Sequence, residues 1–239
     1  MTNKTYFSQI YGQDFSEDDK AFQNRLSKAK AELEKLNLSG KTSALDLGCG
    51  PGAYSLALAQ LGFEEVHGVD YCDNLFHNDM MSHPLIKTHV MDLRELSRLE
   101  VLKTDLILLM GDTVLYLDNL EQLENLFIQI AKRLNSKGIF LLEFRDFSVE
   151  RPLLDRFVTT KSRDNFIKNV GLVYEEDYVY TIDVINKRVG DEWITEKGEN
   201  RKLRISPGKM QSLMEGAGFT IHHISNNSDK VTLLGKLRT

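Results

Sequence analysis

The chain has 239 residues, 41% of them hydrophobic, which is enough for one α/β domain with a core of its own. Its net charge of −5 argues against a dedicated nucleic-acid binder, because such proteins carry an excess of basic residues. With two cysteines, no run of about 18 apolar residues and no basic, apolar leader, we expect a soluble cytoplasmic protein without a disulfide framework or a membrane anchor.

Helix and strand patterns alternate through the first two thirds of the chain. Apolar residues recur every three or four positions over 17–36, which predicts an amphipathic helix. We then expect a short buried strand at 43–47, a glycine loop at 48–52 and a helix over 53–61.

Four further strands and a second long helix follow. Apolar runs predict strands at 66–69, 89–91, 105–110 and, after Gly138, at 139–144. The helix is predicted at 118–134, where Asp118 and Glu121 have the spacing of a capping box. Runs of this kind are typical of a parallel sheet covered on both faces, so we predict a doubly wound α/β fold.

The C-terminal third has a different pattern. From Leu172 to Arg204, β-branched and aromatic residues alternate with charged ones, which predicts antiparallel strands. The basic residues Arg201, Lys202 and Arg204 in this stretch are interpreted as a solvated strand face, with a binding site as the less favoured alternative. Ser206 and Pro207 then begin a helix that stops at Gly216 or Gly218, and two last strands are expected at 219–224 and 230–236.

These patterns divide the chain into three parts. Residues 1–40 form an N-terminal helical segment, in which Tyr6 and Tyr11 are candidates for a lid over a pocket. Residues 41–148 and 206–239 form the α/β core. Residues 149–205 form a small antiparallel β cap inserted after the fifth strand.

A glycine loop lies between the first strand and the next helix. Gly48, Gly50 and Gly52 let the backbone approach a ligand closely, and Asp70 follows about 20 residues later, where an acid that binds a ribose belongs. The spacing alone also fits a dinucleotide fingerprint. Asp46, just before the loop, favours a cationic ligand group over a pyrophosphate, which it would repel.

The stretch Leu45-Asp-Leu-Gly-Cys-Gly-Pro-Gly52 resembles motif I of class I S-adenosylmethionine-dependent methyltransferases. The resemblance covers roughly 40–148 and 206–237, and it implies a seven-stranded Rossmann-like sheet whose last strand is antiparallel. It also implies S-adenosyl-L-methionine as cofactor, with Asp70 on the ribose hydroxyls and Asp92 on the adenine amino group. The full set of implied cofactor-binding residues is Asp46, Gly48, Cys49, Gly50, Gly52, Asp70, Tyr71, Asp92, Leu93, Met110 and Gly111.

The acceptor is expected at the carboxyl edge of the sheet, where Tyr116 follows the fourth strand. Tyr116 is a candidate for orienting the acceptor, with a packed aromatic as the alternative. The chain also has some resemblance to glycine and sarcosine N-methyltransferases, which implies that Arg145 meets a substrate carboxylate. The alternative is a structural ion pair of Arg145 with Asp146 or Glu143.

The sequence therefore predicts methyl transfer to nitrogen or oxygen of a small metabolite, with no nucleic acid, membrane or metal partner. The nucleobase-methylating motif Asn-Pro-Pro-Tyr is absent, as is the acidic set of metal-dependent catechol methyltransferases. Two other hypotheses stay open, a non-catalytic regulatory protein that binds the same cofactor and, less favoured, an NAD-dependent oxidoreductase. The identity of the acceptor and the oligomeric state are not encoded in any motif found.

Overall fold

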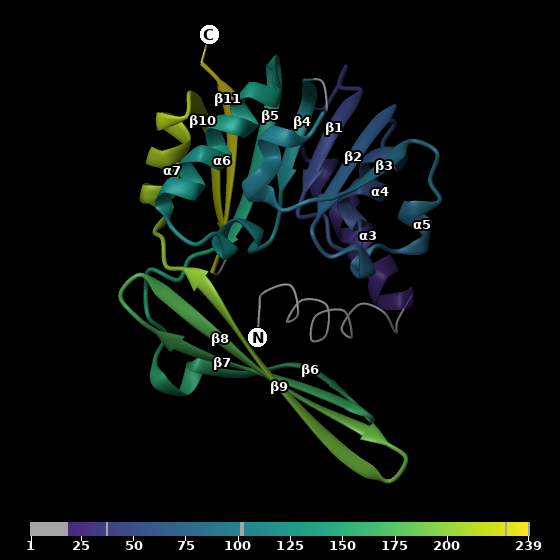
Figure 1. Ribbon diagram of the computed structural model, residues 1–239, viewed down its shortest axis with the longest axis vertical. Helices are drawn as coiled ribbons and strands as arrows, with labels where there is room; N and C mark the ends of the chain where they lie inside the picture. Colours follow the sequence, from purple (N-terminus) through teal and green to yellow (C-terminus); the bar gives the residue numbers. More distant parts are fainter. Residues whose placement is uncertain (1–18, 37, 101–102, 228, 239) are drawn as a thin grey trace.

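The computed structural model describes residues 19–36, 38–100, 103–227 and 229–238. It contains a seven-stranded sheet with helices on both faces and a separate four-stranded sheet (Figure 1). The smaller sheet lies beyond one end of the larger one, on the side where the parallel strands finish. We call the large sheet and its helices the core, and the small sheet the cap.

The core sheet has the strand order β10-β11-β5-β4-β1-β2-β3. Its five parallel strands are β1 (Ser43–Leu47), β2 (Glu65–Asp70), β3 (Ile86–Val90), β4 (Thr104–Leu109) and β5 (Leu134–Arg145). β11 (Lys230–Leu237) pairs antiparallel with both β5 and β10 (Phe219–Asn227). The predicted fold class, with a doubly wound sheet and an antiparallel last strand, is confirmed.

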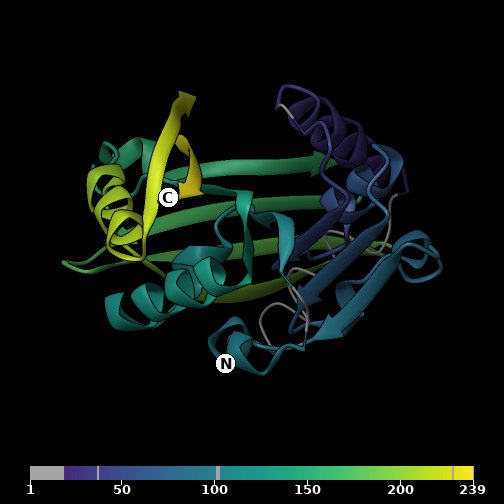
Figure 2. The same cartoon turned by 90° about the horizontal axis from the view of Figure 1, so that it is seen from above.

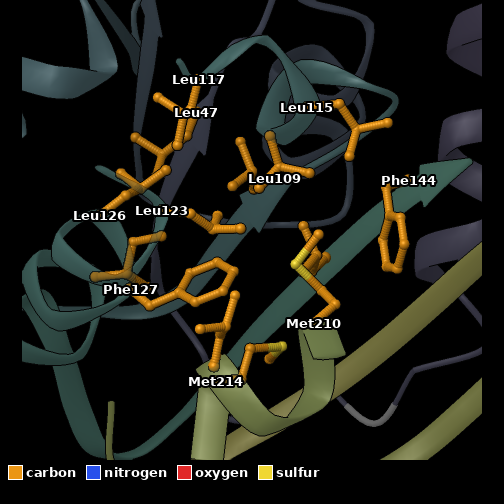
Figure 3. Close-up of a cluster of buried hydrophobic side chains, with 14 of the residues drawn as sticks. Leu47, Leu109, Leu115, Leu117, Leu123, Leu126, Phe127, Phe144, Met210 and Met214 are labelled. Carbon is orange, nitrogen blue, oxygen red and sulfur yellow. The ribbon is translucent and has the colours of Figure 1, made fainter. Parts of the chain in front are cut away.

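Alternate residues of the strands supply two separate hydrophobic layers. Leu106 and Leu108 of β4 pack with α3 (Asp19–Leu33) and α4 (Ala53–Gln60), whereas Ile107 and Leu109 pack on the opposite face. That opposite face is covered by α6 (Leu120–Arg133) and α7 (Pro207–Gly216), and Figure 3 shows Phe127 and Met214 meeting over it. Because both faces are buried, the middle strands are apolar throughout, as the sequence indicated.

The cap is a meander of four antiparallel strands in the order β6-β7-β8-β9. Their bounds are β6 Phe157–Arg163, β7 Phe166–Tyr174, β8 Tyr178–Val189 and β9 Glu192–Leu203. Viewed from above, these strands extend across beneath the core (Figure 2). The cap strands after residue 172 were predicted, while β6 and the start of β7 were not. β6 is largely exposed, so its sequence shows no alternation of apolar and polar residues.

Short elements fill the connections of the core. They are η2 (Asp73–Leu75), α5 (Asn78–Met81), η3 (Leu93–Arg98), η4 (Thr113–Tyr116) and η5 (Leu153–Arg156). η3 and η4 follow the carboxyl ends of β3 and β4, so they place their side chains at the edge of the sheet that faces the cap. Among the described residues, no helix is long and apolar enough to cross a membrane.

Two local predictions were wrong. The N-terminal capping residue of α6 is Asn119, whose side chain accepts a hydrogen bond from the Gln122 backbone N–H. It is not Asp118, whose carboxylate instead accepts hydrogen bonds from Arg94 and Arg201. β3 begins at Ile86, three residues before the predicted strand, and Ile86 is the residue of β3 that is buried. Tyr6 and Tyr11, the predicted lid residues, lie outside the described residues.

Candidate functional site

The glycine loop is fixed to the end of the neighbouring strand β2. The backbone N–H groups of Gly48 and Cys49 both donate to the carbonyl of Val69, at 2.7 and 3.0 Å. Gly50 has φ +51°, a left-handed conformation that side chains disfavour, and a Cβ built there would meet no atom within 4 Å. At Gly52 a Cβ would lie 2.1 Å from the Met80 sulfur. Gly50 therefore faces open space, whereas Gly52 allows close packing behind the loop.

Asp70 lies at the end of β2 and connects two loops. One carboxylate oxygen accepts from the Gly50 backbone N–H at 2.9 Å, and the other accepts from the Cys72 backbone N–H at 2.9 Å. The side chain is buried, and burial raises its pKa above the ordinary value although these hydrogen bonds oppose the rise. Each carboxylate oxygen still has accepting capacity, so Asp70 could accept further hydrogen bonds from the hydroxyl groups of a ligand.

Asp46 is the second buried carboxyl beside the loop. It is 1% exposed, and its Oδ2 accepts from the Ser55 hydroxyl at 2.6 Å. Burial, reinforced by the nearby charge of Asp70, raises the pKa of Asp46 to about 6, although the Ser55 hydrogen bond lowers it. A cation bound here would stabilise the ionised form, because opposite charges attract strongly where water is excluded.

A crevice of about 440 Å³ opens in front of the loop. With the exception of Gly52, every residue predicted for cofactor binding lines it, and so do Tyr116 and Arg145. These residues come from β1, β2 and β5 and from the loops that follow β1, β2, β3 and β4, since parallel strands bring their carboxyl ends to one edge. The expected residues are thus brought together in one cavity.

Asp92, at the start of η3, already has a cationic partner. Its two carboxylate oxygens accept from the guanidinium of Arg94, at 2.6 and 3.0 Å. Burial would raise the pKa of Asp92, but the hydrogen bonds from Arg94 outweigh this effect and lower it. Arg94 also contacts Asp118, so Asp92 belongs to an ion-pair network at the rim of the crevice.

Asp112 is the focus of a buried cluster that joins the core to the cap. Its Oδ2 accepts hydrogen bonds from Nζ of Lys202 and from the guanidinium of Arg145, each at 2.6 Å. Its Oδ1 accepts a hydrogen bond from the Arg145 backbone N–H. Burial would raise the pKa of Asp112, but these two cations outweigh it and lower the pKa to about 2. The structural partners of Arg145 are therefore Asp112 and Asp229, not Asp146 or Glu143.

A second cavity of about 510 Å³ lies between the core and the cap. Arg25, Tyr116 and Arg145 line both cavities, so the two spaces meet at these side chains. We call the second cavity the cap chamber. Tyr116, at the end of η4, stands at this junction with Lys202 Nζ 5.3 Å from the centre of its ring.

Lys202 is the functional candidate that sequence reasoning placed wrongly. It was interpreted as part of a solvated face, yet it is 6% exposed and pairs with Asp112. The alternation of side chains along the strand is consistent with this burial. Lys202 and Asn200 are two residues apart, so both point to the same, inner side of β9, and both are buried. Asp112 could have been found from its position directly after Gly111.

Among the residues that the structure describes, no group of three or more His, Cys, Asp or Glu side chains is arranged to hold a metal ion. The crevice instead offers carboxylates and exposed loop backbone. Such groups suit an organic ligand with hydroxyl and cationic groups.

Comparisons with known proteins agree with this geometry. Residues 44–138 match the family model of a methyltransferase domain. No curated protein matches the sequence significantly. The solved structure of the CcbJ methyltransferase from Streptomyces caelestis is similar with a TM-score of 0.81 at 16% identity, covering 100% of both chains.

Two further similar structures are described by their substrates. The sugar N-methyltransferase KedS8 from a Streptoalloteichus species has a TM-score of 0.74 at 12% identity, covering 97% of this chain and 94% of that one. CalS10, an amino pentose methyltransferase from Micromonospora echinaspora solved with S-adenosylmethionine bound, has a TM-score of 0.72 at 11% identity, covering 100% and 98%. Residues 44–138 therefore match a methyltransferase domain, and the chain has the fold of the class I, S-adenosylmethionine-dependent methyltransferases.

Proposed function

We propose that this protein transfers a methyl group from S-adenosyl-L-methionine to a small molecule that lies in the cap chamber. The observation that carries the proposal is the meeting of two cavities at Tyr116. One cavity has the glycine loop and the buried carboxylates that suit the donor, and the other is wide enough for a small acceptor. Because the cavities share a border, donor and acceptor would face each other there.

The residues of the crevice fit the donor in charge and in shape. The open side of Gly50 admits the ligand against the backbone, and Asp70 would accept hydrogen bonds from the ribose hydroxyls. Asp46 would lie near the cationic methionyl part, whose ammonium and sulfonium favour an ionised carboxyl. Met110 and Gly111, at the end of β4, would border the same group through their backbone.

Asp92 remains our proposed acceptor for the adenine amino group. It lines the crevice, and a carboxylate that pairs with Arg94 keeps lone pairs for a further donor. Tyr71 and Leu93 line the same stretch of wall and would pack against the nucleoside. The pair with Arg94 would hold Asp92 in one orientation before the ligand arrives.

A sulfonium donor supplies an activated methyl group, which passes to the lone pair of the acceptor while the carbon–sulfur bond breaks. The protein's task is then to hold the acceptor in line, about 3 Å from the methyl, and to exclude water. Tyr116 and Arg145 are the residues we propose for this positioning. We propose nitrogen as the acceptor atom, since the similar KedS8 and CalS10 are described as a sugar N-methyltransferase and an amino pentose methyltransferase.

Isothermal titration with S-adenosylhomocysteine tests the donor site, and NAD serves as the competing ligand. We expect S-adenosylhomocysteine to bind one site per chain and NAD to give no heat. Formation of S-adenosylhomocysteine from S-adenosylmethionine across panels of amino sugars, other amines, carboxylic acids and phenols then tests the transfer. Binding without any product would favour the non-catalytic alternative, and binding of NAD alone would favour the oxidoreductase.

A further inference from the structure

The cap chamber contains a buried carboxyl group that takes no part in the donor site. Asp183 of β8 is 3% exposed and lines the chamber. It shares the inner face of the strand with Thr181, which also lines the chamber, because alternate residues of a strand point to the same side. Asp229 is the other acidic residue of the described lining, and it pairs with Arg145 and Arg151. Asp183 is therefore a candidate for chemistry on a molecule that the chamber holds.

Two contacts of Tyr116 locate Asp183 relative to the donor. Lys202, whose Nζ lies 5.3 Å from the centre of the Tyr116 ring, is the register partner of Val179 on β8. Tyr116 also packs against the buried cluster that contains Ile185, further along the same strand. Asp183 lies between Val179 and Ile185 on the inner face that all three share. Its carboxyl group is therefore on the wall of the chamber that adjoins Tyr116, where the donor's methyl group would arrive.

The carboxyl group of Asp183 keeps accepting capacity in this position. Its direct register partners are Val170 on β7 and Gly198 on β9, and neither carries a polar side-chain atom. Among the described residues, its ion pair is with Lys168, whose Nζ lies 3.2 Å from Oδ1. A carboxylate accepts about four hydrogen bonds, so one ion pair leaves room for a donor group of a ligand.

Asp183 has an acid strength suited to a proton acceptor near neutral pH. Burial raises its pKa from 3.8 to about 6, although the charge of Lys202 opposes the rise. The charged groups around it are Lys168 on β7 and Lys202 on β9 and, across the chamber, Arg25, Lys161, Arg145, Arg151 and Asp229. The ionised form predominates at neutral pH, and a base is most effective when its pKa lies near the pH at which it works.

We infer that Asp183 is the general base of the methyl transfer, which accepts a hydrogen bond from the acceptor amine and takes one of its protons. This inference rests on the proposed function, including nitrogen as the acceptor atom. It adds a group that takes part in the chemistry to Tyr116 and Arg145, which we propose for positioning. It also gives a role to a carboxyl group on the inner face of β8, where burial of a charge is costly.

The proton balance of the reaction shows why a base is useful. An alkylammonium has no lone pair, so it loses one proton to the Asp183 carboxylate before it attacks. The lone pair of the free amine then forms the nitrogen–carbon bond, while the electron pair of the carbon–sulfur bond stays on sulfur. The products are a methylated ammonium and S-adenosylhomocysteine, and the proton on Asp183 passes to water when they leave. An alkylammonium holds its proton more tightly than Asp183 does, so the exchange proceeds because methyl transfer consumes the free amine.

The test measures kcat as a function of pH in the full chain, with donor and acceptor saturating at each pH. D-Glucosamine, ethanolamine and benzylamine are the amine probes, and formation of S-adenosylhomocysteine is the readout. We expect the kcat of the parent to fall about tenfold per pH unit below pH 6, because Asp183 becomes protonated. Asp183→Asn should lower kcat about 100-fold or more and remove this acid limb, whereas Asp183→Glu should restore part of the rate.

Two further variants separate a base from a carboxylate that only stabilises the cap. Lys168→Gln breaks the same ion pair but keeps the carboxylate, so it should retain the acid limb. Asp191→Asn makes the same chemical change at a fully exposed position and should leave the whole profile unchanged. Circular dichroism and titration with S-adenosylhomocysteine show whether each variant keeps its fold and its donor site. If Asp183→Asn does not fold, Asp183→Glu decides, since a shifted acid limb supports the base and an unchanged profile overturns it.

The outcomes distinguish this inference from the proposed function. If Asp183→Asn keeps either the acid limb or the kcat of the parent, the inference is overturned and the proposed function stands. If the chain methylates only carboxylic acids or phenols, the inference is overturned as well, while transfer to a small molecule stands. If S-adenosylhomocysteine does not bind, or no compound of any panel is methylated, the proposed function fails and the inference fails with it.

Discussion

Lys202 Nζ lies 2.6 Å from the Asp112 carboxylate, so an ion pair with both partners buried joins the inner face of the cap to the carboxyl end of β4. Nζ is also 5.3 and 5.4 Å from the ring centres of Tyr116 and Phe147. The contact therefore fixes the position of the cap near the place where the two cavities meet. It makes the stability of the cap and the geometry of the proposed acceptor site depend on the same side chains.

Removing one member of this pair should destabilise the protein strongly. Asp112→Asn leaves the buried charge of Lys202 without its carboxylate, which costs about 3–5 kcal/mol of unfolding free energy, whereas Lys202→Met leaves Asp112 paired with Arg145 and should cost less. The double variant should be more stable than the two single losses added together predict, because neither charge then remains. Urea denaturation of the four proteins of this double-mutant cycle measures the coupling. Additive losses would show that the pair contributes nothing as a pair.

Donor affinity should depend on pH through Asp46. Because burial raises its pKa from 3.8 to about 6, Asp46 destabilises the native state as pH rises through this range, and a bound cation relieves that cost. Below pH 6 the donor must displace a proton, so its affinity should fall by up to about tenfold per pH unit. Titration with S-adenosylhomocysteine between pH 5 and pH 8 measures this slope. It should be flatter in Asp46→Asn, and an identical slope in the variant would assign the effect to another group.

A side chain at Gly50 should block the donor without unfolding the protein. Gly50 and Gly40 both have positive φ and open space where a Cβ would lie, but only Gly50 lines the crevice. Each alanine variant should lose about 1–2 kcal/mol of stability from the left-handed backbone. Gly50→Ala should in addition weaken S-adenosylhomocysteine about tenfold or more through the steric conflict, whereas Gly40→Ala should bind normally. Equal affinities in the two variants would contradict the placement of the donor.

Tyr116→Phe should lower kcat while the affinity for the donor stays unchanged. The phenol stands at the junction of the cavities, and loss of one hydrogen bond to the acceptor corresponds to about a tenfold effect. Tyr180→Phe is the matched control, because Tyr180 lies on the face of β8 opposite to Thr181 and Asp183, which line the cap chamber. Formation of S-adenosylhomocysteine with a substrate found in the panels gives the rate. An unchanged kcat would assign Tyr116 to packing alone.

Much of the core was predictable because its signals are local. Continuous apolar runs marked β1, β4 and β5, and the glycine loop followed by Asp70 placed the crevice at the correct edge of the sheet. Ser206 was correctly identified as the N-cap of α7, where its side chain accepts from the Lys209 backbone N–H. Each of these features depends on a few neighbouring residues and on general rules of parallel sheets.

The partnership of core and cap could not be predicted in the same way. Lys202 and Asp112 are 90 residues apart, and their contact depends on how β9 pairs with β8 and how the cap then meets the core. The basic stretch around Lys202 looked solvated because one sequence does not show which strand face is covered. Arg145 was placed correctly at the end of β5, but its partners come from the loop after β4 and from the turn before β11, which only the folded chain brings together.

The most direct test is a crystal structure of the protein grown with S-adenosylhomocysteine. The proposed function predicts the nucleoside in the crevice in front of Gly50, its ribose hydroxyls within hydrogen-bond distance of the Asp70 carboxylate and its sulfur directed toward Tyr116. A ligand bound elsewhere, or a ribose that leaves Asp70 without contact, would contradict it.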